Sequence, residues 1–119
     1  MRNHNQLKAF QLADELVILI YGITRDFPKE EIYGLTQQMR RSAVSVPSNI
    51  VEGCGRESIV EYHRFLDIAF GSLKELHYQC TIADRLGYIK DAAMEGLELR
   101  FVETEKVLGA LLRSLRSLK

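Results

Sequence analysis

Apolar residues recur along this chain at helical spacing, and turn-forming residues interrupt the pattern at three places. The interruptions are Phe27-Pro28, Gly53-Cys54-Gly55 and Leu86-Gly87-Tyr88. Between them, apolar positions lie three and four residues apart, the period of a helix with a buried face. The pattern predicts helices over about 6–26, 30–52, 58–86 and 91–117. Short connections favour antiparallel neighbours, so we expect an all-α, up-down antiparallel four-helix bundle forming a single domain, 1–119.

The first predicted helix carries two apolar stripes. One consists of Phe10, Ala13, Val17, Tyr21 and Thr24, and the other, on a different side, of Leu12, Leu16, Leu19 and Ile23. A helix at the surface of a monomer needs only one such stripe. Two stripes predict two partners, and we take Leu12, Leu16, Leu19 and Ile23 as candidates for an interface with another copy of the chain.

The second predicted helix has an unusually wide apolar arc. Ile32, Leu35, Met39, Ala43, Val46 and Ile50 are expected to face the core, and Val44, Pro47 and Val51 widen the arc and become further interface candidates. Pro47 lies inside the helix and removes one amide donor. Because the apolar period continues through Pro47, we expect a kinked but continuous helix, with Ser45 and Ser48 bonding to the carbonyls that the kink exposes.

The last two predicted helices begin at recognisable capping residues. Ser58 with Glu61 three residues later is a capping-box pattern, and Asp91 is a candidate N-cap. The fourth helix carries a sustained heptad-like seam of Met94, Leu97, Phe101, Thr104, Leu108, Leu111, Leu115 and Leu118. Packing within the bundle accounts for that seam without any further partner.

Charge and cysteine content narrow the classes of function. Sixteen Lys plus Arg balance sixteen Asp plus Glu, so the net charge is zero and only a local patch could attract nucleic acid. Lys106, Arg113, Arg116 and Lys119 follow Glu105 without an acid, which suits the end of a helix.

Cys54 and Cys80 lack metal-ligand spacing, and residues 1–6 lack the apolar core of a signal peptide. We expect a cytoplasmic protein with reduced cysteines and no membrane segment, since the apolar run 16–21 is too short to cross a bilayer.

Candidate catalytic and metal-binding groups are scarce. His63 and His77 are fourteen residues apart on one predicted helix, hence ~21 Å apart, too far to share a metal ion. The chain has neither the paired Glu-x-x-His motifs of a di-iron bundle nor a Gly-x-Ser-x-Gly elbow. We therefore expect no metal, no cofactor and no enzymatic activity. An enzyme would need a polar pocket at subunit interfaces, around Ser45, Asn49, Glu52 and Arg56.

Three arginines are the remaining candidates for binding an anion or nucleic acid. Arg40 falls within the apolar arc, Arg41 lies on the polar face, and Arg56 follows Gly53 and Gly55 beside the next helix start. The two glycines do not match a phosphate-binding loop and are interpreted as a helix C-cap and turn. The alternative for Arg40 and Arg56 is an inter-subunit ion pair with Glu52, Glu57 or Glu61.

The run 27–53, with RRSAVSVPSNI at 40–50, resembles the hallmark of the four helix bundle protein family, also called the ribosomal-RNA intervening-sequence proteins. The likeness continues through Arg56, 65–76 and 86–88 and covers nearly the whole chain; Phe10 stands where a tryptophan is expected, and Val51 and Cys54 replace commoner residues. The resemblance implies a ring-like homopentamer. It also implies kinship with the accessory variability protein of diversity-generating retroelements, a pentamer that binds nucleic acid and the reverse transcriptase. That protein is far more basic than this chain, so its nucleic-acid binding does not simply transfer.

Two functional hypotheses follow, because the family that the chain resembles has no established biochemical activity. The first is a non-enzymatic homo-oligomeric module that binds RNA or a nucleic-acid-handling protein, with Arg40, Arg41 and Arg56 as the binding residues. The alternative is a structural scaffold, also homo-oligomeric, whose only partner is another protein.

Overall fold

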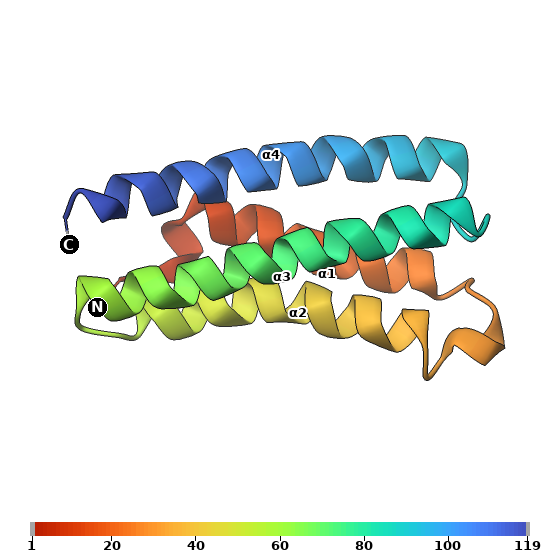
Figure 1. The fold of residues 1–119 in the computed structure, drawn as a ribbon, viewed down its shortest axis with the longest axis horizontal. Helices are drawn as coiled ribbons and strands as arrows, with labels where there is room; N and C mark the ends of the chain where they lie inside the picture. The colour runs from red at the N-terminus through yellow and green to blue at the C-terminus, as the bar shows by residue number, and fades with distance from the viewer. Residues whose placement is uncertain (1, 119) are drawn as a thin grey trace.

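Four α-helices and no strand make up residues 2–118, which are the residues described by this computed structural model. The helices are α1 (Lys8–Thr24), α2 (Leu35–Cys54), α3 (Ile59–Arg85) and α4 (Asp91–Arg116), with short 3-10 helices at His4–Gln6 and Lys29–Glu31. Successive helices run in opposite directions along a common axis (Figure 1). The prediction of an all-α bundle of four helices is confirmed.

The predicted helix boundaries differ from the structure mainly at the second helix. Residues 30–34 were expected to be helical, but α2 begins at Leu35, after the 3-10 helix, and it ends at Cys54. The Glu31 carboxylate accepts a hydrogen bond from the Leu35 amide at 3.0 Å and so satisfies one of the free donors at the helix start. The first helix is also shorter than predicted, whereas α3 and α4 lie within one residue of the expected bounds.

One of the two predicted N-cap residues is confirmed. The Ser58 side chain accepts from the Glu61 amide at 3.1 Å, but the N-cap of α4 is Lys90, and Asp91 is the first helical residue. Gly87 ends α3 with a φ of 79°, the left-handed region that favours glycine. Of the two glycines interpreted as a C-cap and turn, only Gly55 lies past the helix end.

Gly53 instead lies inside α2, where the helix packs tightly against α3. A Cβ atom at this position would be 3.0 Å from the Phe65 Cβ and 3.3 Å from the Tyr62 carbonyl oxygen. The glycine is therefore required by helix packing rather than by a turn. It belongs to the α2–α3 pair, the most extensive helix contact in the bundle.

The core stripe of α1 runs between the two predicted stripes and takes residues from each. Leu12 and Leu16 have only 4% and 1% of their surface exposed, so the prediction that they face a second copy is wrong. Pro47 is likewise buried within the single chain. The reason is that α1 packs against both α2 and α4, so its buried arc is wider than one stripe. Tyr21, a member of the other predicted stripe, is exposed.

Pro47 lies within a continuous helix, as predicted. The carbonyl that loses its helical donor at Pro47 is that of Ala43. Nearby, the Asn49 side-chain amide donates to the Ser45 carbonyl at 2.8 Å. The Ser45 hydroxyl bonds instead with the Ser72 hydroxyl of α3 at 2.9 Å. Asn49 and Ser45 thus couple the proline region of α2 to its neighbouring helix.

Candidate functional site

A groove lies on the outer side of α1 and the first half of α2. We call it the arginine groove; its lining is Tyr21, Ile32, Tyr33, Thr36, Gln37, Arg40, Arg41 and Val44. Tyr33 leaves 89% of its surface exposed, and Ile32, predicted to face the core, leaves 51% exposed. Two arginines and no acid line the groove, so it combines an apolar surface with positive charge.

Arg40 and Arg41 are held in place by contacts within the chain. Arg40 donates from Nε to the Thr24 hydroxyl at 2.9 Å, and its guanidinium lies 4.6 Å from the centre of the Tyr21 ring. Arg41 donates to the Glu75 carboxylate of α3 at 3.2 Å and to the Gln38 side chain at 3.0 Å. The charge of Arg41 is therefore partly offset by an exposed ion pair.

Arg56 does not join the other two arginines. It follows the opposite end of α2, sixteen residues after Arg40, which is roughly 24 Å along a helix. Its guanidinium pairs with Glu52 at 2.6 Å and lies 4.9 Å from the centre of the Phe65 ring. The ion pair with Glu52, which we considered as a contact between subunits, forms within one chain. Arg40 and Arg41 therefore lie in one groove, whereas Arg56 lies apart from them.

A second, more apolar groove continues along α1 and the second half of α2. We call it the proline groove; its lining is Phe10, Asp14, Val17, Val44, Pro47, Ser48 and Val51. It brings together Val44, Pro47 and Val51, three of the predicted interface residues, with Pro47 buried at its base. Val44 lines both grooves, which makes them one continuous surface over α1 and α2.

Leu19 and Ile23, the other predicted interface residues, lie elsewhere. Leu19 is one turn after Glu15, which forms an ion pair with Arg100 of α4, so Leu19 lies on the α4 side of α1. Ile23 is half-buried and packs against the core. Neither residue lines the proline groove.

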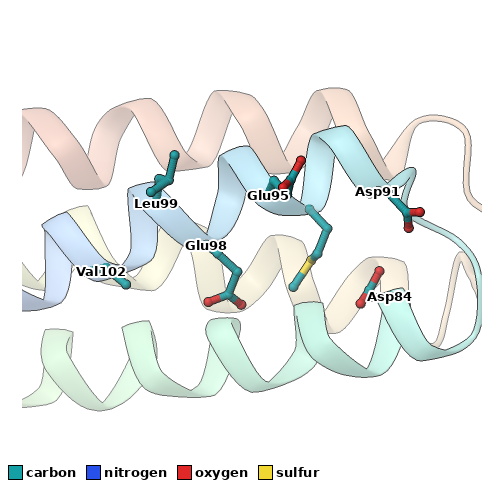
Figure 2. Close-up of a pocket in the computed structure, with 7 residues that line it drawn as sticks. Asp84, Asp91, Glu95, Glu98, Leu99 and Val102 are labelled. Carbon is teal, nitrogen blue, oxygen red and sulfur yellow. The ribbon is translucent and has the colours of Figure 1, made fainter.

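The opposite side of the bundle carries a groove that was not predicted from the sequence pattern. This acidic groove, with a volume of about 690 Å³, is lined by Asp84, Asp91, Met94, Glu95, Glu98, Leu99 and Val102. Figure 2 shows Asp84 of α3 and Asp91 of α4 facing each other across the connection between the two helices. Leu99 leaves 74% of its surface exposed, so the groove is apolar as well as acidic. The signal in the sequence was the helical spacing of Asp91, Glu95 and Glu98.

His77 joins α3 to α4 beside the acidic groove. Its Nδ1 lies 2.6 Å from a Glu105 oxygen, its Nε2 lies 2.9 Å from a Glu98 oxygen, and its ring stacks on Phe101 with centroids 4.3 Å apart. Lys74 also reaches Glu105, at 3.2 Å. Both carboxylates receive a hydrogen bond only if both ring nitrogens carry hydrogen. The seven-residue spacing of the two glutamates on one helix face was the signal for this cluster.

The groups considered for catalysis are not assembled into a reactive site. Ser45 bonds to Asn49 and to Ser72 of α3, and Glu52 pairs with Arg56. These residues line none of the three grooves. Burial raises the pKa of the Cys80 thiol to about 12 and raises the pKa of Cys54, so neither forms the nucleophilic thiolate readily. Within residues 2–118, no group of three or more His, Cys, Asp or Glu side chains is arranged to hold a metal ion.

Comparison with known proteins agrees with the helical architecture. A family model described as 23S rRNA-intervening sequence protein matches residues 5–110. The fold is similar to the crystal structure of a protein with unknown function from the S23 ribosomal protein family of Bacteroides thetaiotaomicron VPI-5482. The TM-score is 0.80 at 21% sequence identity, over 88% of this chain and 95% of that one. No curated protein matches the sequence. None of the described helices is long and apolar enough to cross a membrane.

Proposed function

The chain belongs to the 23S rRNA-intervening sequence protein family, and we propose that it is a non-enzymatic helical module that assembles with copies of itself to form a scaffold for a protein partner. The observation that carries this proposal is the continuous apolar surface of the arginine and proline grooves. Tyr33, Ile32, Val44 and Val51 remain exposed there although the bundle core is complete without them. Contiguous exposed apolar surface of this kind marks an interaction site.

The absence of a reactive constellation supports a non-enzymatic role. Both ring nitrogens of His77 contact carboxylates, those of Glu98 and Glu105. The thiols of Cys54 and Cys80 are buried.

RNA binding is the second candidate. Arg41 and Arg56 are ion-paired within the chain, which weakens the case for the predicted arginines. The exposed C-terminal part of α4 supports RNA binding better than Arg41 and Arg56 do. There, Lys106, Arg113 and Arg116 follow Glu105 with no intervening acid. Cations along one helix end can contact phosphates without reading sequence.

Self-assembly is tested by sedimentation velocity on the wild type and on a Val44→Asp variant at micromolar concentration. We expect an oligomer for the wild type and a shift to monomer for Val44→Asp, because a carboxylate at the junction of the two grooves would be desolvated in the interface. Val60→Asp is the matched control, since Val60 is also exposed but lies at the start of α3. A monomeric wild type would contradict the proposal.

Measurement of RNA binding by the purified protein distinguishes the two candidate functions. An RNA-binding module should bind fluorescent single-stranded RNA at low salt, with affinity that falls steeply as salt rises. Lys106→Glu/Arg113→Glu should then abolish binding, whereas Arg56→Glu should change it little. A scaffold for proteins only should show no salt-dependent RNA binding.

A further inference from the structure

We infer that the acidic groove is where the protein partner docks, and that the docking segment is an amphipathic helix with lysines and arginines beside its apolar face. The assignment rests on the proposed scaffold function and specifies the chemistry of its protein partner. The surface proposed for self-assembly lies over α1 and α2, whereas the acidic groove lies along α4 beside the end of α3. A partner can therefore occupy the acidic groove while the copies remain assembled.

The apolar part of the acidic groove is exposed beyond what the bundle core uses. Met94 is buried, whereas Leu99 and Val102 leave 74% and 60% of their surface exposed and are not members of the core. The two exposed residues are three positions apart, so they lie on one face of α4. Neighbouring exposed apolar side chains in a groove of about 690 Å³ mark an interaction site.

The carboxylates around this apolar surface have no cation to neutralise them within the chain. Four acids and no lysine or arginine belong to the described lining: Asp84, Asp91, Glu95 and Glu98. Glu98 contacts His77, but no ion pair within residues 2–118 includes any of the other three acids. Charge complementarity therefore selects a partner that brings cations to the edges of an apolar surface.

Helix stability does not account for the acids of the groove. Asp91 is the first residue of α4, where the helix dipole favours a carboxylate. Asp84 lies in the last turn of α3, where the dipole disfavours one. Because Asp84 and Asp91 face each other across the connection (Figure 2), both contribute to one negative surface. The position of Asp84 is thus unfavourable for its own helix and favourable for binding a cation.

The shape of the groove fits a short helix. Its lining extends along α4 from Asp91 to Val102, eleven residues or roughly 16 Å, which is about three helical turns. A helix lying along it would place apolar residues, spaced three and four apart, against Leu99 and Val102. Lysines or arginines on its flanks would then reach the carboxylates. Nucleic acid is disfavoured here, because its phosphates carry the same charge as the groove.

Fluorescence anisotropy with a labelled model peptide tests this docking site in the full chain. The peptide has about fifteen residues, with leucines at helical spacing and lysines on both flanks. It should bind the wild type and gain helical circular dichroism on binding. Asp84→Lys/Asp91→Lys/Glu95→Lys should weaken binding by at least roughly tenfold, because the groove then repels the lysines. Leu99→Ser/Val102→Ser should weaken it by roughly fivefold, because less apolar surface is buried.

Matched controls separate the groove from overall charge. Asp26→Lys/Glu57→Lys/Glu103→Lys changes the net charge equally at exposed positions outside the groove. It should bind the peptide within about twofold of the wild type at physiological salt, where distant charges are screened. A peptide of scrambled order and one with glutamates in place of lysines should both bind at least roughly tenfold more weakly. Thermal melts should show every variant folded.

The docking site and the proposed self-assembly fail in different ways. A wild type that assembles but does not bind the peptide, or that binds it no more tightly than the scrambled one, overturns the docking site alone. Binding that survives charge reversal of the groove also overturns it. Loss of assembly in the reversed variant would mean that a second copy occupies the groove, which overturns it as well. A monomeric wild type that binds the peptide in the groove contradicts self-assembly and supports the docking site.

Discussion

The Tyr88 hydroxyl donates a hydrogen bond of 2.9 Å to Glu31 and joins the connection before α4 to the connection before α2. The other oxygen of the same carboxylate accepts from the Leu35 amide at 3.0 Å. The Phe27 and Tyr88 rings pack beside them, with centroids 5.3 Å apart. The Glu31 carboxylate therefore caps the first turn of α2 and also links the two connections at one end of the bundle. The arginine and acidic grooves both lie near this end.

We predict a pH-dependent stability from Glu31. Hydrogen bonds from Leu35 and Tyr88 hold the pKa of its carboxyl below the usual 4.5. Because the folded pKa is the lower one, the stabilisation is complete above pH 4.5 and is lost as pH falls through the folded pKa. In urea titrations, Glu31→Gln should be less stable than the wild type at pH 7, and the difference should shrink as the pH falls through the folded pKa of Glu31. Tyr88→Phe should show a smaller effect, since Leu35 still donates; a difference that does not vary with pH would count against Glu31.

Two glycine substitutions should change stability in opposite directions. Gly53→Ala places a Cβ 3.0 Å from the Phe65 Cβ, so helices α2 and α3 must separate slightly. We expect a loss of about 1–3 kcal/mol in the free energy of unfolding. Gly71, within α3, has no atom within 4 Å of an added Cβ, so Gly71→Ala should gain roughly 0.5–1 kcal/mol from helix propensity. Chemical denaturation measures both, and a stabilising Gly53→Ala would refute the close approach.

Removing His77 should loosen α4 from α3. His77→Ala deletes the ring that stacks on Phe101 and leaves Glu98 and Glu105 without their shared donor. We expect a loss of about 1–3 kcal/mol in the free energy of unfolding. Tyr78→Ala, at the neighbouring exposed position, should change it by less than roughly 0.5 kcal/mol. Equal effects of the two substitutions would mean that the cluster contributes no specific stability.

The cysteines should react only when the chain unfolds. Cys54 and Cys80 are both free and buried, and burial raises the pKa of Cys80 to about 12. An alkylating reagent at pH 8 should therefore label neither thiol in native protein and both in urea, as followed by mass spectrometry. Rapid labelling without denaturant would show that the core opens locally.

Helix existence was predictable because its signals are local. Phe27-Pro28 and Leu86-Gly87 interrupt the apolar period, and the Ser58 cap bonds to a residue only three positions away. The start of α2 was not predictable in the same way. Ile32 continues the apolar period, yet it lies outside the helix, because Glu31 caps Leu35 and accepts from Tyr88, 57 residues away.

The sequence by itself determined that this chain forms four amphipathic helices with more apolar surface than a single seam requires. Periodicity gives the direction of each apolar residue around its own helix, but it does not say which neighbouring helix covers it. Tertiary packing decided that Leu12 and Leu16 are inside, that Tyr33 and Leu99 are outside, and that Arg56 stands apart from Arg40. It also placed acids of α3 and α4 in one groove, because residues distant in sequence meet only when helices pack against each other.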